Sequence, residues 1–440
     1  MNRFLIPVFL LTWISMAQAQ LNKINFQDFT LDNGLHVILH QDKSTPIVAV
    51  SVMYHVGSKN ENPERTGFAH FFEHLLFEGS ENISRGEYDK YIEKAGGTLN
   101  ANTSMDRTYY FEILPSNQLE LGLWLESERM LHAKVENVGI ETQRQVVKEE
   151  RRQRIDNQPY GSFLEQIMKR AYKTHPYKWP VIGSMAHLDA AEEKDYKNFY
   201  KDFYVPNNAI ISIAGDIDYE NAKALVTKYF STIPKSMKPI YRPSVVEPAL
   251  GGEVRDTFYD NIQLPAVLMA YRIPAAGTPE YYAVSMLGTL LSQGESSRLQ
   301  RALVDDQQKA VAVGNFPLDL EDPGVSIAYG ICSMGTDVLD AEKSITAEID
   351  RIKTEPIGDE EFQKLRNQVE NDFVTSNSRV AGIAESLANY KMYYGDANLI
   401  NTELQRYLAV TKDDIKNAAI KYYNNNNRVV LHYLPKPVNP

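Results

Sequence analysis

The chain of 440 residues is long enough for two or three domains with large buried cores. Hydrophobic residues make up 43% and charged residues 23%, which excludes a disordered tail and a membrane bundle. The formal net charge of -11 argues against nucleic acid and anionic lipid as partners. The single cysteine excludes an internal disulfide and a thiolate zinc cluster, so histidine and carboxylate must hold any metal.

The first residues have the pattern of a signal peptide. Arg3 gives a positive start, residues 4–16 form an apolar run, and Ala17-Gln18-Ala19 is a small-x-small end. We expect residues 1–19 to be cleaved off after Ala19 and the chain to be exported, in a bacterium to the periplasm. The apolar run is too short for an uncleaved membrane anchor, and no later segment has the pattern of an integral membrane span.

The elements that follow alternate strands and helices. Residues 26–56 predict strands with a turn at Asp32-Asn33-Gly34, and TGFAHFFEHLLFEGS (66–80) predicts a buried helix that ends near Gly79. Two further helices are predicted over 116–131 and 141–156, and a strand over 206–218.

A linker divides the chain. Residues 233–252 hold four prolines and two glycines without hydrophobic periodicity. We therefore predict one domain over 20–235, a linker over 236–252 and a second domain over 253–440.

The second domain repeats the plan of the first. At a constant offset of 215 residues, apolar positions face apolar positions: Ala69, Phe72, Leu75, Leu76 and Gly79 face Val284, Leu287, Leu290, Leu291 and Gly294. Three polar positions are lost at that offset: His70, Glu73 and His74 face Ser285, Gly288 and Thr289. The chain is predicted to be duplicated with chemistry in the first copy only, although any two amphipathic helices after a strand look alike.

The helix at 66–80 carries an H-x-x-E-H string. His74 lies about 40° and Glu73 about 60° on either side of His70, so the two imidazoles and the carboxylate share one stripe. Histidines four residues apart can bind one Zn²⁺, and a carboxylate on the same stripe can accept a proton from its bound water. The alternative is two half-exposed histidines beside an ordinary glutamate.

A catalytic zinc usually has a third protein ligand. Cys332 is a poor candidate, whereas Glu149 and Glu150 lie together on the helix predicted over 141–156. The spacing by itself does not separate these two glutamates.

These motifs together resemble the pitrilysin/insulinase family of zinc peptidases, the inverzincins. The resemblance covers nearly the whole mature chain and rests on several segments in family order: LDNGLHVIL, GFAHFFEHLLFEGS, GGTLNANTSMDRTYYF, LESERM, HPYKWPVIG and PNNAIISIAGDID. It implies one Zn²⁺ per chain on His70, His74 and Glu150, with Glu73 as general base. Glu149 remains the alternative ligand.

The resemblance also implies the fold, an α+β protein. We expect two homologous mixed α/β domains, each with an antiparallel-rich sheet and helices on one face, that together form half of a clamshell. The N-terminal domain would be the zinc-binding peptidase domain. Peptide would add as a strand to a sheet edge in GGTLNANTSMDRTYYFEI, at Asn100 and Ala101.

The chain departs from the family pattern at two positions. A family glutamate seven residues before the ligand glutamate falls on Gln143. The family's substrate-binding arginine is matched by Arg298 in GESSRL, but the tyrosine that accompanies it falls on Val311. As in the short two-subunit members related to mitochondrial processing peptidase, a homologous subunit without H-x-x-E-H would complete the site as a heterodimer; a homodimer is the alternative.

The predicted function is that of a zinc endopeptidase acting on peptides or unfolded polypeptides in a closed chamber. A noncatalytic peptide-binding or assembly subunit of the same fold is the alternative function. A purely structural zinc site is disfavoured because such sites usually close with four ligands, often thiolates.

Overall fold

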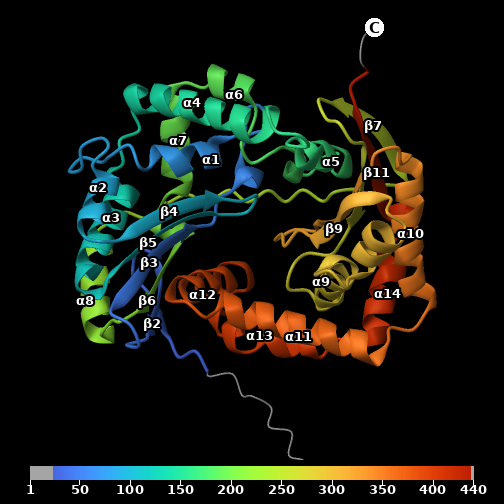
Figure 1. Cartoon of the computed structure of the whole chain (residues 1–440). Coiled ribbons are helices and arrows are strands. Elements are labelled where there is room, and N and C mark those ends of the chain that lie inside the picture. The colour runs from blue at the N-terminus through green and yellow to red at the C-terminus, as the bar shows by residue number, and fades with distance from the viewer. Residues whose placement is uncertain (1–22, 438–440) are drawn as a thin grey trace, which may run out of the picture.

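The computed structural model describes residues 23–437 and consists of two halves, each built on one β-sheet (Figure 1). The predicted signal peptide, residues 1–19, lies outside the described residues. Between 23 and 437, no helix combines the length and the apolar character needed to cross a membrane.

The first half contains a six-stranded sheet and eight helices. Its strands are β1 (Gln27–Thr30), β2 (His36–Gln41), β3 (Ile47–Tyr54), β4 (Thr98–Thr103), β5 (Thr108–Pro115) and β6 (Ala209–Gly215). Its helices are α1 (Phe68–Leu75), α2 (Tyr88–Lys94), α3 (Leu119–His132), α4 (Asn137–Arg151), α5 (Phe163–Ala171), α6 (Met185–Ala190), α7 (Glu193–Phe203) and α8 (Tyr219–Phe230).

The second half contains a five-stranded sheet and six helices. Its strands are β7 (Val254–Asp260), β8 (Ala266–Arg272), β9 (Ala310–Pro317), β10 (Val325–Cys332) and β11 (Arg428–Pro435). Its helices are α9 (Pro279–Ser292), α10 (Val338–Thr354), α11 (Asp359–Ser376), α12 (Val380–Tyr394), α13 (Glu403–Leu408) and α14 (Lys412–Tyr422).

The two sheets share one topology. The first has the strand order β1-β2-β6-β3-β5-β4 and the second β7-β11-β8-β10-β9, so the second repeats the first without β1. In each sheet one pair is parallel, β2 with β6 and β7 with β11, and the other pairs are antiparallel. The predicted duplication into two mixed α/β units is confirmed.

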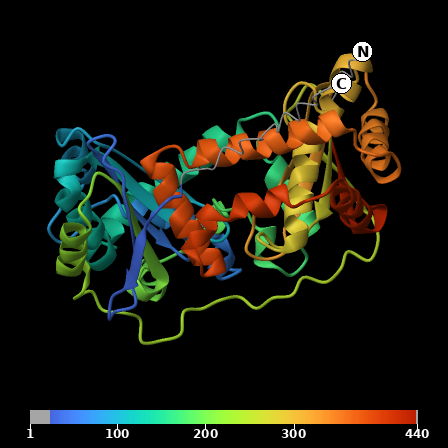
Figure 2. The same ribbon diagram turned by 90° about the horizontal axis from the view of Figure 1, so that it is seen from below.

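An extended connection joins the halves. Residues 231–253 form neither helix nor strand, and Figure 2 shows this segment running along one side of the molecule. The segment is anchored at Glu247, whose carboxylate accepts the backbone N–H groups of Lys173, Thr174 and His175.

Each sheet has one face covered by helices of its own half. In β3 the residues alternate: Val50 and Val52 belong to a core with Leu123 of α3, whereas Ala49 and Met53 face the other way. Helices of the same half therefore cover one face of each sheet, as expected.

The opposite faces are covered by helices that the two halves exchange (Figure 1). Ile383 and Leu387 of α12, in the second half, pack with Ala49 and Met53 on the first sheet. Helix α5 of the first half packs in the same way on the second sheet, where Ile167 joins a core of strand residues. Because the offset of 215 residues places 163–171 on 378–386, the exchanged helices are equivalent members of the duplication.

Candidate metal centre

Helix α1 carries the two histidines and is fixed at its first turn. It starts after Gly67, whose φ of 96° is a left-handed conformation that favours glycine. A Cβ at this position would lie 2.7 Å from the backbone oxygen of Ile182, so the helix can start here only with glycine. This close approach fixes the start of α1 and therefore the position of His70 in its first turn.

Aromatic side chains anchor the other side of α1. Phe68 stacks on Tyr196 at 4.6 Å between ring centroids, and Phe72 stacks on Phe199 at 5.6 Å, both partners lying on α7. Burial of such rings provides most of the packing energy of a short helix. The polar stripe with His70 is therefore held in one orientation.

A buried glutamate caps α1 from the preceding loop. Glu61 is 3% exposed, and its two carboxylate oxygens accept the backbone N–H groups of Gly67 and Ala69, each at 2.8 Å. Burial raises the pKa of Glu61 to about 8, against the effect of these donors. Sequence analysis missed this residue, because the chain gives no sign that a loop glutamate folds back onto the helix.

Helix α4 brings a carboxylate to the histidines. Gly139 lies against Leu75, where an added Cβ would be 3.4 Å from the leucine, and thereby allows α4 to approach α1 closely. Near the end of α4, Glu150 turns inward with a 12% exposed side chain. Glu149 is half-exposed and pairs with Arg152 at 3.0 Å, so the structure brings Glu150 to the histidines and leaves Glu149 outside.

The three side chains form one compact group. Ligand atoms of His70, His74 and Glu150 all lie within 4.8 Å of one another. Glu150 Oε2 is 3.5 Å from His70 Nε2 and 3.0 Å from His74 Nε2. Burial acts to raise the pKa of Glu150, but the two imidazoles outweigh it and hold the pKa well below its ordinary value.

The donor atoms of this group lack partners. Among the described residues, His74 Nε2 and Glu150 Oε2, which face each other, are buried without a hydrogen bond. Buried polar atoms are normally satisfied, so converging unsatisfied atoms of this kind fit a bound cation. Two imidazole nitrogens and a carboxylate form a common donor set for catalytic zinc.

Glu73 lies on the same stripe and is half-buried. Burial above all raises the pKa values of Tyr110 and Tyr204, and the negative charge of Glu73 adds to the effect. Tyr110 also donates to the backbone oxygen of Phe72 at 2.8 Å. Glu73 thus lies next to His74 on α1, and the backbone of its neighbour Phe72 is tied to β5.

Gln143 lies on α4 two turns before Glu150. Its side-chain amide donates to Glu78, and its carbonyl oxygen is buried without a partner in the described part of the chain. A glutamate at this position would face the carboxylate of Glu78 instead of donating to it. Glutamine therefore suits the contact that this chain makes.

Asn100 and Ala101 lie on β4, the edge strand of the first sheet, which packs beside α1. Asn100 is exposed, and its side-chain oxygen accepts the N–H of Ala101 at 2.8 Å. An edge strand next to the histidine helix is the position that the sequence predicts for a bound peptide.

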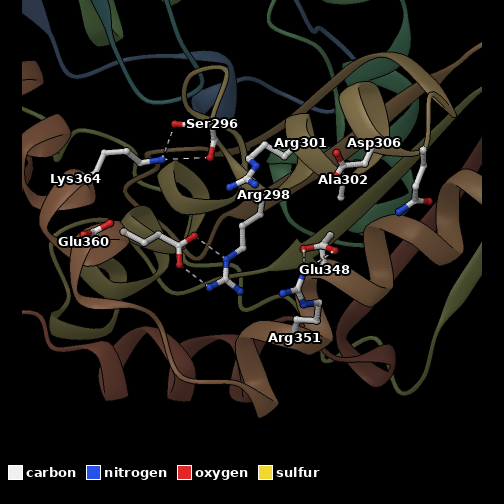
Figure 3. A pocket seen from close by; sticks show the side chains of 11 residues that line it. Ser296, Arg298, Arg301, Ala302, Asp306, Glu348, Arg351, Glu360 and Lys364 are labelled. Carbon is white, nitrogen blue, oxygen red and sulfur yellow. Dashed lines mark hydrogen bonds and ion pairs between the residues drawn. The ribbon is translucent and has the colours of Figure 1, made fainter.

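Arg298 occupies a separate pocket of about 680 Å³ in the second half (Figure 3). All of the lining residues lie between 296 and 364, so the structure does not bring Arg298 to the histidines of its own chain. Its guanidinium forms a two-point ion pair with Glu361, at 2.9 and 2.7 Å. Val311 is 55% exposed on β9, the edge strand of the second sheet.

Comparisons with known proteins match both halves of the chain. Residues 36–184 match the insulinase family (peptidase family M16), and residues 191–369 match the peptidase M16 inactive domain. The chain is 31% identical over 433 residues to a protein named zinc protease PqqE from Helicobacter pylori, and the match covers 97% of each chain.

Solved structures show the same fold. The crystal structure of a protease from Helicobacter pylori matches with a TM-score of 0.90 and 30% identity, over 94% of this chain and 100% of that one. The periplasmic protease PqqL from Escherichia coli matches with a TM-score of 0.75 and 21% identity, over 93% of this chain and 47% of that one. This chain thus has the fold of half of such a clamshell, and it belongs to the insulinase family, peptidase family M16.

Proposed function

We propose that the chain is a zinc-dependent endopeptidase, with His70, His74 and Glu150 as metal ligands and Glu73 as general base. The observation that carries the proposal is the convergence of three donor side chains within 4.8 Å, with unsatisfied buried atoms on His74 and Glu150 where they meet. The relative named zinc protease PqqE supports the same activity. A zinc ion bound here would lower the pKa of its water and polarise a peptide carbonyl.

Glu73, Glu150 and Arg154 would have different roles in the reaction. Glu73 would accept the proton of the attacking water and pass it to the leaving amine, as a half-buried carboxylate on the ligand stripe can. Glu150 would contribute negative charge to the metal, and Arg154, which donates to Glu150 Oε1 at 2.5 Å, would hold its second oxygen in place. Three ligands leave a position open for water, which a structural zinc site lacks.

Peptide would bind along β4, as an added strand that includes Asn100 and Ala101. Such binding uses main-chain hydrogen bonds, so peptides of many sequences would be accepted as substrates. Arg298 would contact substrate only after it leaves Glu361 or when presented to the site of another subunit.

The oligomer and its location are part of the proposal. Because the chain spans 47% of PqqL, a second half-shell would be needed to close a chamber. A homologous subunit without H-x-x-E-H would supply the missing arginine and tyrosine, with a homodimer as the alternative. The signal pattern over residues 1–19 and the periplasmic location named for PqqL support export to the periplasm.

The test is Glu73→Gln, with Glu149→Gln as matched control on the exposed side of α4. Both variants should retain one zinc ion per chain by elemental analysis. Hydrolysis of an unfolded polypeptide, measured with and without the homologous subunit, should fall by about 10² to 10⁴ in Glu73→Gln and stay unchanged in the control. Full activity of Glu73→Gln would contradict the mechanism, and a metal-free wild-type protein would favour a noncatalytic binding subunit.

A further inference from the structure

The edge hairpins of the two halves meet at their turns. Asp106 lies in the turn between β4 and β5, and Glu321 lies in the turn between β9 and β10. The two residues are 215 positions apart, the offset that relates the two halves, and the N–H of Glu321 donates to Asp106 Oδ2 at 3.0 Å. Equivalent turns of the duplication thus bind each other.

Lys59 lies at the centre of this junction. It is 3% exposed, and its ammonium group contacts Asp106 at 2.9 Å, Asp322 at 3.1 Å, and Glu321. Tyr177 donates to Asp106 at 2.6 Å and accepts the N–H of Asp322 at 3.1 Å.

Two histidines complete the junction from the side of the first half. His55 lies 2.9 Å from Glu321, and His175 lies 3.4 Å from Asp322. One buried ammonium, two imidazoles and a tyrosine thereby bind three carboxylates, two of which come from the second half.

The basic groups of the cluster keep the carboxylate of Glu321 ionised. Burial acts to raise the pKa of Glu321, but His55 and Lys59 outweigh it and lower the pKa to about 2. Lys59 and Asp106 are buried, whereas the side chains of Glu321 and Asp322 are 26% and 35% exposed. An arrangement of the halves that removed partners from the buried Lys59 ammonium would cost free energy. A cluster of this kind at the junction of two halves therefore selects their relative orientation.

The junction is continuous with the candidate metal centre. Lys59 lies in η1 (Ser58–Asn60), and two residues later Glu61 caps the helix that carries His70. Asp106 lies three residues after the end of β4, the proposed peptide-binding edge. A displacement of the second half would thus be transmitted to α1 and to β4 through only two or three residues.

We propose that Lys59 is a positioning residue, which uses Glu321 and Asp322 to fix the second half against α1 and β4 and so aligns bound peptide with the metal. The proposal rests on the proposed peptidase function. Lys59 itself touches neither metal nor substrate.

The test alters the second half alone. Glu321→Gln with Asp322→Asn removes two charges, retains the shape and leaves Lys59, Asp106 and α1 untouched. The matched control is Glu342→Gln, which weakens an ion cluster with Arg255, Arg428 and His432 within the second half. Lys59→Met attacks the same cluster from the first half, and Asp322→Asn by itself serves if the double variant does not fold.

Two readouts separate positioning from general destabilisation. Spin labels at Val138 on α4 and Met334 in the second half, 67% and 90% exposed, report the distance between the halves once the buried Cys332 is replaced by Ala. The distance distribution should broaden or shift in the cluster variants and remain unchanged in Glu342→Gln. The zinc dissociation constant should stay the same, while kcat for a long polypeptide should fall about tenfold with KM little changed, as expected for a bound substrate that is misplaced.

Each outcome decides the matter. An unchanged distance distribution would overturn the proposal, and so would a broadened distribution with unchanged kcat. If the wild-type protein cleaves no peptide with or without a homologous subunit, the proposed function fails, while the distance measurement still tests the junction.

Discussion

His74 Nε2 and Glu150 Oε2 lie 3.0 Å apart, although 76 positions separate the two residues in the chain. Neither atom has a hydrogen-bond partner among residues 23–437. The packing of α4 on α1 brings the two side chains together. A preformed site of this kind binds its metal without a large rearrangement, because the ordering has occurred on folding.

The first prediction separates Glu150 from Glu149. Glu150→Gln should weaken zinc binding by at least about 100-fold. Mutation of residues that only support metal ligands already costs up to about 100-fold in affinity, and loss of a ligand should cost no less. Glu149→Gln should bind zinc as the wild type does, because Glu149 is 51% exposed and pairs with Arg152. Competition with a chromophoric chelator measures both affinities, and the reverse order of effects would exchange the roles of the two glutamates.

The second prediction concerns stability with metal. Zinc that binds only the folded chain should stabilise it by about 2.7 kcal/mol at a free concentration 100 times the dissociation constant. Scanning calorimetry with zinc and with a chelator should show this as a higher Tm. His74→Ala should remove the difference between the two scans, whereas a zinc-dependent Tm that survives in this variant would place the metal elsewhere.

The third prediction concerns pH and Glu61. Its pKa is raised to about 8 in the folded chain, whereas an unfolded glutamate has a pKa of about 4.3. Between these values the folded protein keeps a proton that the unfolded chain has released. The free energy of unfolding should therefore fall as pH rises, by at most about 1.4 kcal/mol per pH unit from this group.

Glu61→Gln should remove this contribution. Urea unfolding of both proteins between about pH 5 and pH 8 should show that the advantage of the wild type over the variant shrinks as pH rises. Parallel curves for the two proteins would mean that Glu61 titrates alike in the folded and unfolded chains.

The fourth prediction concerns the exchanged helices. Leu387→Ala should cost about 2 to 5 kcal/mol, because this fully buried side chain of α12 packs on the first sheet. Hydrogen exchange should accelerate in β3 and β6 of the first half, far away in sequence. Val374→Ala on α11 is the control, since Val374 is 40% exposed and should leave both strands protected.

Several parts of the fold could be predicted because they are local. The helix at 66–80 and the strands around Asp32-Asn33-Gly34 follow from periodicity and turn residues, whereas the edge position of Asn100 was implied by the family resemblance. The spacing of His70 and His74 predicts two of the three donors, because one helical turn places both on one stripe.

Other parts depend on contacts that no spacing encodes. An amphipathic pattern shows that α12 has an apolar face, but not that this face covers the sheet of the other half. Lys59, Asp106 and Glu321 are ordinary charges in the sequence and form a cluster only after both hairpins are placed. The ion pair between Arg298 and Glu361 was equally invisible, because the two side chains meet through tertiary packing.

The exchange of α5 and α12 has a consequence for the origin of the chain. Two equivalent helices that each cover the partner's sheet are the arrangement of a domain-swapped homodimer, in which each protomer lends the same element to the other. Joining two such protomers by residues 231–253 would produce the present chain without any change in packing. A single-domain protein with this arrangement would be stable only as a pair, whereas in the fused chain the pairing is permanent and only the first half needs to carry the histidines.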